Sequence, residues 1–212
     1  MIQQKETRPL KKTAKIAKPP AIVEQEHGRY LIKAGQLQGT IVARAFPKPP
    51  SKFRHLVAEE TGKTTDDAIV RLIEKLDGLR AKSRALRRAD PSLDTGVPTL
   101  VEFADALRSY TPGPKVLDIL HDHALLRQRG AQLSDLAKTG NFASPQDLLN
   151  AYEKLGVEIY KQIDPDEALV AGLPLIVQMP ESGALENTDM AILHPELQDA
   201  VLQLLGTIRR KR

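Results

Sequence analysis

Apolar and polar residues alternate with a period of two in the first part of the chain after residue 28. Residues 29–33 are a short strand candidate, and residues 40–46 place Ile41, Ala43 and Ala45 on one face. A third strand is predicted at residues 55–59. These three strands precede a helix, so this region is predicted to have the order β-β-β-α.

The apolar spacing changes to the helical period after residue 65. Thr64 or Thr65 can cap this helix, and Asp66 and Asp67 fall in its first turn, where the helix dipole favours acids. The helix continues to Arg88 through four arginines spaced by one, three or four residues: Arg80, Arg84, Arg87 and Arg88. A solvated helix face is the simplest interpretation of this group. Contact with phosphates is the functional one.

Helical periodicity dominates the second half. Helices are predicted at 99–110, 115–127, 134–138, 145–163 and 197–205, with one strand at 173–179. Thr99 and Glu102 form a capping box at the first of these helices. The predicted fold class is α+β. We expect a basic arm at 1–20, a β-β-β-α domain at 21–90, a linker at 91–98, a helical domain at 99–207 and a basic tail at 208–212.

The short helix, Gly140 and the helix that begins at Ser144-Pro145 follow the order of a helix-turn-helix. In that interpretation Gln146, Asn150 and Lys154 face outward from the recognition helix, and Gln and Asn can bind adenine edges. Two acids of the same helix, Asp147 and Glu153, would oppose phosphates. A purely structural or protein-binding helix pair is the alternative.

The formal net charge of +4 is unevenly distributed. Residues 1–20 sum to +5, residues 21–110 to +3, residues 111–207 to −8 and residues 208–212 to +4. The arm is poor in apolar residues, which predicts disorder. It is either a solubilising tail or a phosphate-binding arm, and the candidate contacts of arm and tail are Lys11, Lys12, Lys15, Arg209 and Arg210.

Composition excludes several classes of protein. The chain has no cysteine, which excludes disulfides and cysteine-ligated metal sites, and no apolar run approaches 18 residues. We therefore expect a cytoplasmic bacterial protein without membrane contact.

Catalytic motifs are not found in the sequence. Thr61-Gly-Lys-Thr is no phosphate-binding P-loop, because Val57 stands where that motif needs glycine. His121 and His123 are two apart on a helix and point in different directions, so they cannot chelate one ion; one packed and one exposed histidine are expected. We expect no enzyme activity, no metal and no cofactor.

Two resemblances follow from these motifs. The β-β-β-α order with Gly62-x-Thr64-x-x-x-Ala68 resembles the fold of HicB-type antitoxins and part of a double-stranded-RNA-binding domain, over about 50 residues. Residues 96–205 resemble a helical module of bacterial proteins of the HNH-endonuclease type. That resemblance is carried by Pro98-Thr99 with Glu102, Ala106-Leu107, the His123 helix, Leu136-Ala137, Asn150-Ala-Tyr152, Leu155-Gly156 and His194-Pro-Glu-Leu197. No nuclease motif follows, so catalysis does not carry over.

Three functions stay open. The first is a non-enzymatic regulatory protein that binds double-stranded DNA through its basic pieces and its helix-turn-helix. The second is an interaction subunit or inhibitor, antitoxin-like or nuclease-associated, whose acidic domain binds a basic protein. The third is an accessory of a restriction-type nuclease. A homodimer fits either of the first two.

Overall fold

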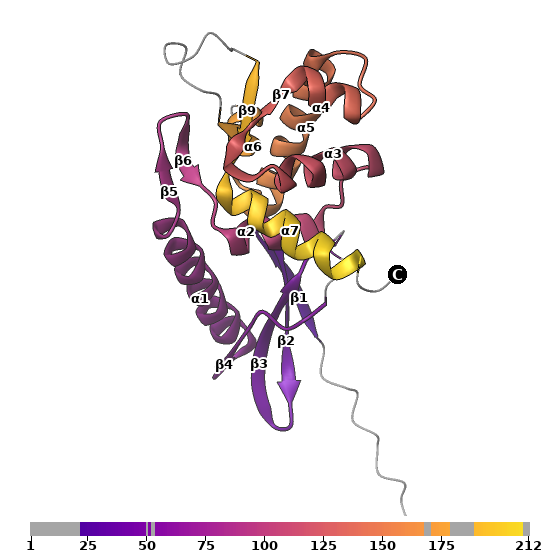
Figure 1. Ribbon diagram of the computed structural model, residues 1–212. Coiled ribbons are helices and arrows are strands. Elements are labelled where there is room, and N and C mark those ends of the chain that lie inside the picture. The colour runs from indigo at the N-terminus through magenta and orange to yellow at the C-terminus, as the bar shows by residue number, and fades with distance from the viewer. Residues whose placement is uncertain (1–21, 50, 52–53, 168–170, 179–188, 210–212) are drawn as a thin grey trace, which may run out of the picture.

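The computed structural model describes residues 22–49, 51, 54–167, 171–178 and 189–209. Its fold is α+β, as predicted: an antiparallel sheet comes first and a mostly helical region follows (Figure 1). We call residues 22–85 the sheet unit and residues 86–209 the helical unit. The sheet lies below and the helical unit above in this view, and α1 runs along their common side.

The sheet unit has four strands where three were predicted. They lie in the order β1-β2-β3-β4, all antiparallel, with bounds β1 Val23–His27, β2 Tyr30–Leu37, β3 Thr40–Pro47 and β4 Ala58–Gly62. Strand β1 was missed because most of its residues are polar and exposed, as edge strands commonly are. The last strand begins three residues later than predicted.

The two faces of this sheet differ in chemistry. One face packs Ile32, Ala34, Ala43 and Ala45 against α1 (Thr65–Ala85). The opposite face carries a cross-strand row in which Glu24 pairs with Lys33 at 2.7 Å and Arg44 pairs with Glu59 at 2.5 Å. Alternation along each strand therefore decides which face α1 covers.

Helix α1 begins as the sequence predicts. The Thr64 hydroxyl accepts the backbone N–H of Asp67 at 3.1 Å, which makes Thr64 the cap. The helix has 21 residues and is therefore about 32 Å long, so that its second half extends beyond the sheet to the helical unit.

Residues 88–97 form a hairpin rather than a linker. Strands β5 (Arg88–Asp90) and β6 (Leu93–Val97) pair antiparallel, and the Asp90 carboxylate accepts the Ser92 backbone N–H at 3.0 Å in the turn between them. The turn-forming residues that predicted a linker belong to this hairpin, and Leu93 and Val97 enter the larger core.

The helical unit is built around one core. Its elements are α2 Leu100–Ser109, α3 Pro114–Leu125, the 3-10 turn η1 Arg127–Arg129, β7 Ala131–Gln132, α4 Leu133–Thr139, α5 Pro145–Ile163, α6 Leu173–Ile176, β8 Val177–Gln178, β9 Met190–Leu193 and α7 Pro195–Arg209. The capping box of Thr99 and Glu102 and the Ser144 cap are confirmed. The strand predicted at 173–179 is wrong in its first half, which is α6; Met179 lies outside the described residues.

The order within this unit is that of a winged helix. After α3, strand β7 is followed by α4 and α5, and then by strands β8 and β9. Strand β9 pairs with both β7 and β8, so the small sheet has the order β7-β9-β8. Helices α4 and α5 thus occupy the helix-turn-helix position, with α6 added between α5 and the second strand.

Candidate nucleic-acid interface

Helix α5 buries one face and exposes the other. Leu148, Tyr152 and Leu155 are buried in the core, whereas Gln146 and Asn150 are exposed on the opposite side. The Gln146 side-chain amide donates to the Asn150 side-chain oxygen at 3.1 Å. Lys154 is exposed one further turn along. The three α5 residues singled out from the sequence therefore lie at the surface.

The two acids of α5 differ in their surroundings, because Asp147 is exposed on the same side as Asn150 whereas Glu153 is partly buried. Asp147 accepts a hydrogen bond from the Ser144 hydroxyl at 2.9 Å and so belongs to the cap of its own helix. Glu153 accepts the backbone N–H groups of Gly172 and Leu173 at 2.8 and 2.6 Å. Glu153 is thus held against the segment after α5, whereas Asp147 stays exposed beside Asn150.

Close backbone packing holds α5 against the segment that follows it. At Gly156 an added Cβ would meet the backbone of Gly172, and at Gly172 it would meet the backbone of Glu153 and Val157. The helix and the segment can approach this closely only because both positions lack a side chain. Together with the Glu153 contacts, this packing fixes the orientation of α5.

The charge around the turn between α4 and α5 is nearly balanced. Lys138 is exposed and lies 3.7 Å from Asp135. The Lys115 ammonium donates to the Asn141 carbonyl at 2.7 Å and lies 4.0 Å from the centre of the Phe142 ring. This surface therefore has little net positive charge with which to attract phosphates.

A buried histidine supports the winged helix from within. His123 Nε2 donates to the Ala191 carbonyl at 3.1 Å, and its Nδ1 accepts from the Tyr152 hydroxyl at 3.2 Å, which is a neutral imidazole with both nitrogens satisfied. Burial lowers its pKa to about 4, although the Ala191 carbonyl raises it in part. The sequence predicted one packed and one exposed histidine, but His121 is also buried.

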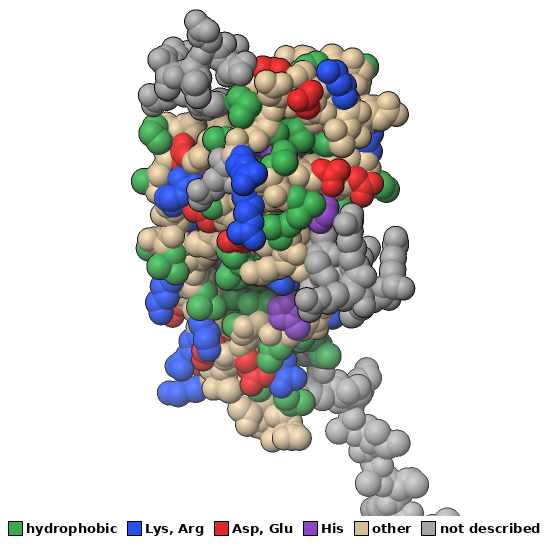
Figure 2. Space-filling model, viewed as in Figure 1, with side chains coloured by type: hydrophobic (Ala, Val, Ile, Leu, Met, Phe, Trp, Pro, Cys, Tyr) green, Lys and Arg blue, Asp and Glu red, His purple; other side chains and the backbone are tan. Residues whose placement is uncertain are grey.

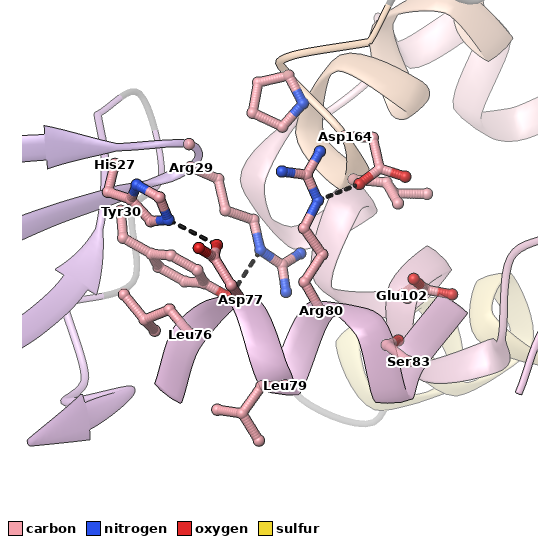
Figure 3. Close-up of a pocket in the computed structure, with 13 residues that line it drawn as sticks. His27, Arg29, Tyr30, Leu76, Asp77, Leu79, Arg80, Ser83, Glu102 and Asp164 are labelled. Carbon is pink, nitrogen blue, oxygen red and sulfur yellow. Dashed lines mark hydrogen bonds and ion pairs between the residues drawn. The ribbon is translucent and has the colours of Figure 1, made fainter. Parts of the chain in front are cut away.

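Helix α1 ends at Ala85 rather than continuing to Arg88 as predicted, so of the four arginines only Arg80 and Arg84 lie on it, and both turn toward the helical unit. Arg80 pairs with Asp164 at 2.8 Å and Asp166 at 2.9 Å, and Arg84 pairs with Asp164 at 3.0 Å and Glu167 at 2.6 Å. Figure 3 shows Arg80 reaching from α1 to Asp164, with Glu102 beyond them. These pairs join two segments that are more than 80 residues apart.

Arg87 and Arg88 lie just after α1 and complete this group, which we call the arginine cluster. Arg87 pairs with Glu102 and Asp164, both at 2.8 Å, and its side chain is only 3% exposed. Arg88 pairs with Glu196 at 2.8 Å and donates to His194 Nδ1 at 3.2 Å. Phosphate contact by Arg87 was predicted from the sequence, but its guanidinium is enclosed by protein. The other three guanidiniums are occupied by carboxylates.

The carboxylates at the centre of this cluster are stabilised in their charged form. Burial alone would raise the pKa of Asp164, but hydrogen bonds from Arg87, Arg84 and Arg80 outweigh burial and lower it. The pKa of Glu102 is lowered in the same way by Arg87 and by the Thr99 backbone N–H, again against burial. The spacing of the arginines predicted a basic helix face, and the acids at 164, 166 and 167 form an acidic segment. No short-range feature of the sequence indicates that this face and this segment are partners.

Several predicted residues lie outside this description. Lys11, Lys12, Lys15 and Arg210 fall outside the described residues, and Arg209 ends α7 without a described side chain. In the described ranges no group of three His, Cys, Asp or Glu side chains could hold a metal ion. Across those same ranges no helix is both long and apolar enough to cross a membrane.

Comparisons with known proteins found no matching family model, no matching curated protein and no matching solved structure.

Proposed function

We propose that the protein is a non-enzymatic DNA-binding protein of the bacterial cytoplasm, with α5 as its recognition helix. One observation carries the proposal: the winged-helix order of α3 to β9 presents Gln146 and Asn150, two amides suited to adenine edges, on the exposed side of a buried helix. The fixed orientation of α5, held through Glu153 and Gly156, supports it because base contacts need a rigid helix.

Phosphate attraction is assigned to the arm and the tail. The arginine cluster is occupied by carboxylates, so the remaining dense basic segments are residues 1–20, with Lys11, Lys12 and Lys15, and residues 209–212, with Arg209 and Arg210. In this proposal the arm and tail supply salt-dependent affinity, while α5 supplies the choice of sequence. The two roles are separable by experiment.

Selection from random duplexes followed by fluorescence anisotropy tests the proposal. We expect an enriched sequence. The affinity for it should fall steeply between roughly 50 and 300 mM salt, with a slope that corresponds to several phosphate contacts. Gln146→Ala/Asn150→Ala should weaken binding to that sequence by roughly 10-fold or more and leave random duplexes unaffected. Removing residues 1–20 should weaken both and flatten the salt dependence.

A matched control uses two exposed glutamines of the sheet unit. Gln25→Ala/Gln36→Ala removes the same kind of side chain and should leave binding unchanged. Absence of any enriched sequence overturns the proposal. A protein partner that survives nuclease treatment in a pull-down would then favour the interaction subunit. Part of the acidic surface on which that alternative rests is already paired with the arginine cluster of the same chain.

A further inference from the structure

A cleft of about 520 Å³ lies where the sheet unit meets the helical unit. Its described lining comes from four places: the turn between β1 and β2, residues 47–49, 51, 55 and 57 at and after the end of β3, the last turn of α2, and the end of α5 with Pro165. None of the side chains assigned to DNA contact lines it. It also extends beside the smaller cavity of Figure 3, since Gly28, Arg29 and Tyr30 line both.

The lining of this cleft is strongly basic. Arg29, Lys48, Arg108 and Lys161 contribute permanent positive charges, and Asp105 is the one carboxylate within the described lining. These four cations come from four separate segments around one concavity, and three of them are paired with neighbouring carboxylates. An anion is therefore the ligand that this cleft favours.

The present partners of these cations are easily exchanged. Lys48 pairs with Glu26, Lys161 with Glu158 at 2.6 Å and Arg108 with Asp105 at 2.9 Å, and the three carboxylates are 63%, 37% and 45% exposed. Exposed pairs of this kind contribute little to stability. A ligand with several negative charges can replace them, and it then gains contacts from more than one cation at once.

The apolar side chains that line the cleft favour a ligand that also has an apolar group. Pro47, Pro49, Val57 and Pro165 line the cleft between the charged groups. The volume lies within the range of small-molecule sites, roughly 300–1,000 Å³. We propose that this cleft binds an organophosphate of nucleotide size, with its phosphates toward Arg108 and Lys161. This binding does not depend on the proposed DNA-binding function.

Titration calorimetry on the full chain tests the proposal with ATP, pyrophosphate and adenosine as probes. We expect ATP to bind more tightly than either pyrophosphate or adenosine. Arg108→Ala/Lys161→Ala should weaken ATP binding at least about tenfold, because two charge-assisted contacts are lost. Both side chains are exposed, so the variant should keep the circular dichroism spectrum and melting temperature of the parent.

A matched control removes two exposed lysines of the sheet unit that do not line the cleft. Lys63→Ala/Lys82→Ala should change ATP affinity by less than about twofold. Absence of ATP binding at millimolar concentration, equal binding of ATP and pyrophosphate, or equal loss in the two variants overturns the proposal. It is also overturned if the cleft variant weakens duplex DNA binding while ATP does not bind. If the selected duplex does not bind the parent chain, the proposed DNA-binding function is overturned, but the proposal of ATP binding in the cleft is not affected.

Discussion

The sheet unit and the helical unit bury very different cores. Among the described residues, the sheet unit's core has nine buried hydrophobic residues, five of them alanine, whereas the helical unit's core has 27 and includes Phe103, Tyr152 and Tyr160. Small cores supply little stability of their own. The larger unit therefore provides most of the apolar burial, and the smaller one depends on how it is joined to its neighbour.

Ion pairs cross the boundary between the two units. Arg80 and Arg84 of the sheet unit reach Asp164, which is fully buried at the end of α5, and Arg87 of the helical unit binds the same carboxylate. The uneven charge along the chain has a structural meaning here, since a basic face of the front and acids of the back are complementary surfaces of one molecule. Figure 2 shows Lys and Arg side chains with Asp and Glu side chains among them along the edge where α1 lies.

The strongest way to break this arrangement is Arg87→Met, which removes the enclosed guanidinium and keeps much of its length. Glu102 and Asp164 would keep buried negative charge with one cation fewer, so we expect a loss of about 3–5 kcal/mol in the free energy of unfolding. Urea denaturation measures this loss.

Arg71→Met is the matched control, because Arg71 pairs with Asp67 on the exposed side of α1. It should cost no more than about 0.5 kcal/mol. Equal losses in the two variants would mean that the enclosed Arg87 pairs stabilise the fold no more than an exposed pair does.

The second prediction concerns the helical unit and pH. The pKa of His123 is about 4 in the folded protein and 6.5 when unfolded, so the unfolded chain binds more protons between these values. The stability that comes from keeping this imidazole neutral is fully present above pH 6.5. It is lost as pH falls toward 4, by about 3 kcal/mol in total. His194, whose pKa is also lowered by burial, adds to the same window.

Unfolding free energies measured from pH 7 to 4 in the parent and in His123→Phe check this prediction. The variant is less stable at pH 7, because Tyr152 and Ala191 lose a partner, but its slope with pH should be shallower. Loss of the Glu102 and Asp164 pairs comes at lower pH, below the ordinary pKa of a carboxyl, because their pKa values are lowered. An unchanged slope in His123→Phe contradicts the prediction.

The parts of the fold that could be predicted are those with local causes. Three helix starts could be predicted because a hydroxyl side chain accepts the backbone N–H three residues further on, at Thr64, Thr99 and Ser144. This pattern lies within four consecutive residues. The placement of Gln146 and Asn150 at the surface followed from helical periodicity alone. Strand β1 and the hairpin at 88–97 could not be predicted, since pairing with a neighbouring strand forms them and their own residues are mostly polar.

The partners of the arginines had no local signal. Arg87 and Asp164 are 77 residues apart in the chain, and only the packing of α1 beside the end of α5 brings them together. The same limit applied to Glu153, which the sequence placed among groups that repel phosphate, although its carboxylate binds two backbone N–H groups. Helical spacing gives the face on which a charge lies, but the identity of its partner depends on tertiary structure.

The smallest expected effect compares one helix cap in each unit. Thr64→Ala removes the acceptor for the Asp67 backbone N–H at the start of α1, and Thr99→Ala removes the acceptor for the Glu102 N–H at the start of α2. Each should cost about 1 kcal/mol. Thr99→Ala should cost the more of the two, because its hydroxyl also contacts the Glu102 carboxylate that binds Arg87.

In the double variant Thr99→Ala/Arg87→Met, urea denaturation should show a loss that differs from the sum of the single losses, since both residues contact Glu102. Thr64→Ala/Arg87→Met should be additive, because Thr64 and Arg87 lie at opposite ends of α1. Additivity in both pairs would separate the cap of α2 from the arginine cluster.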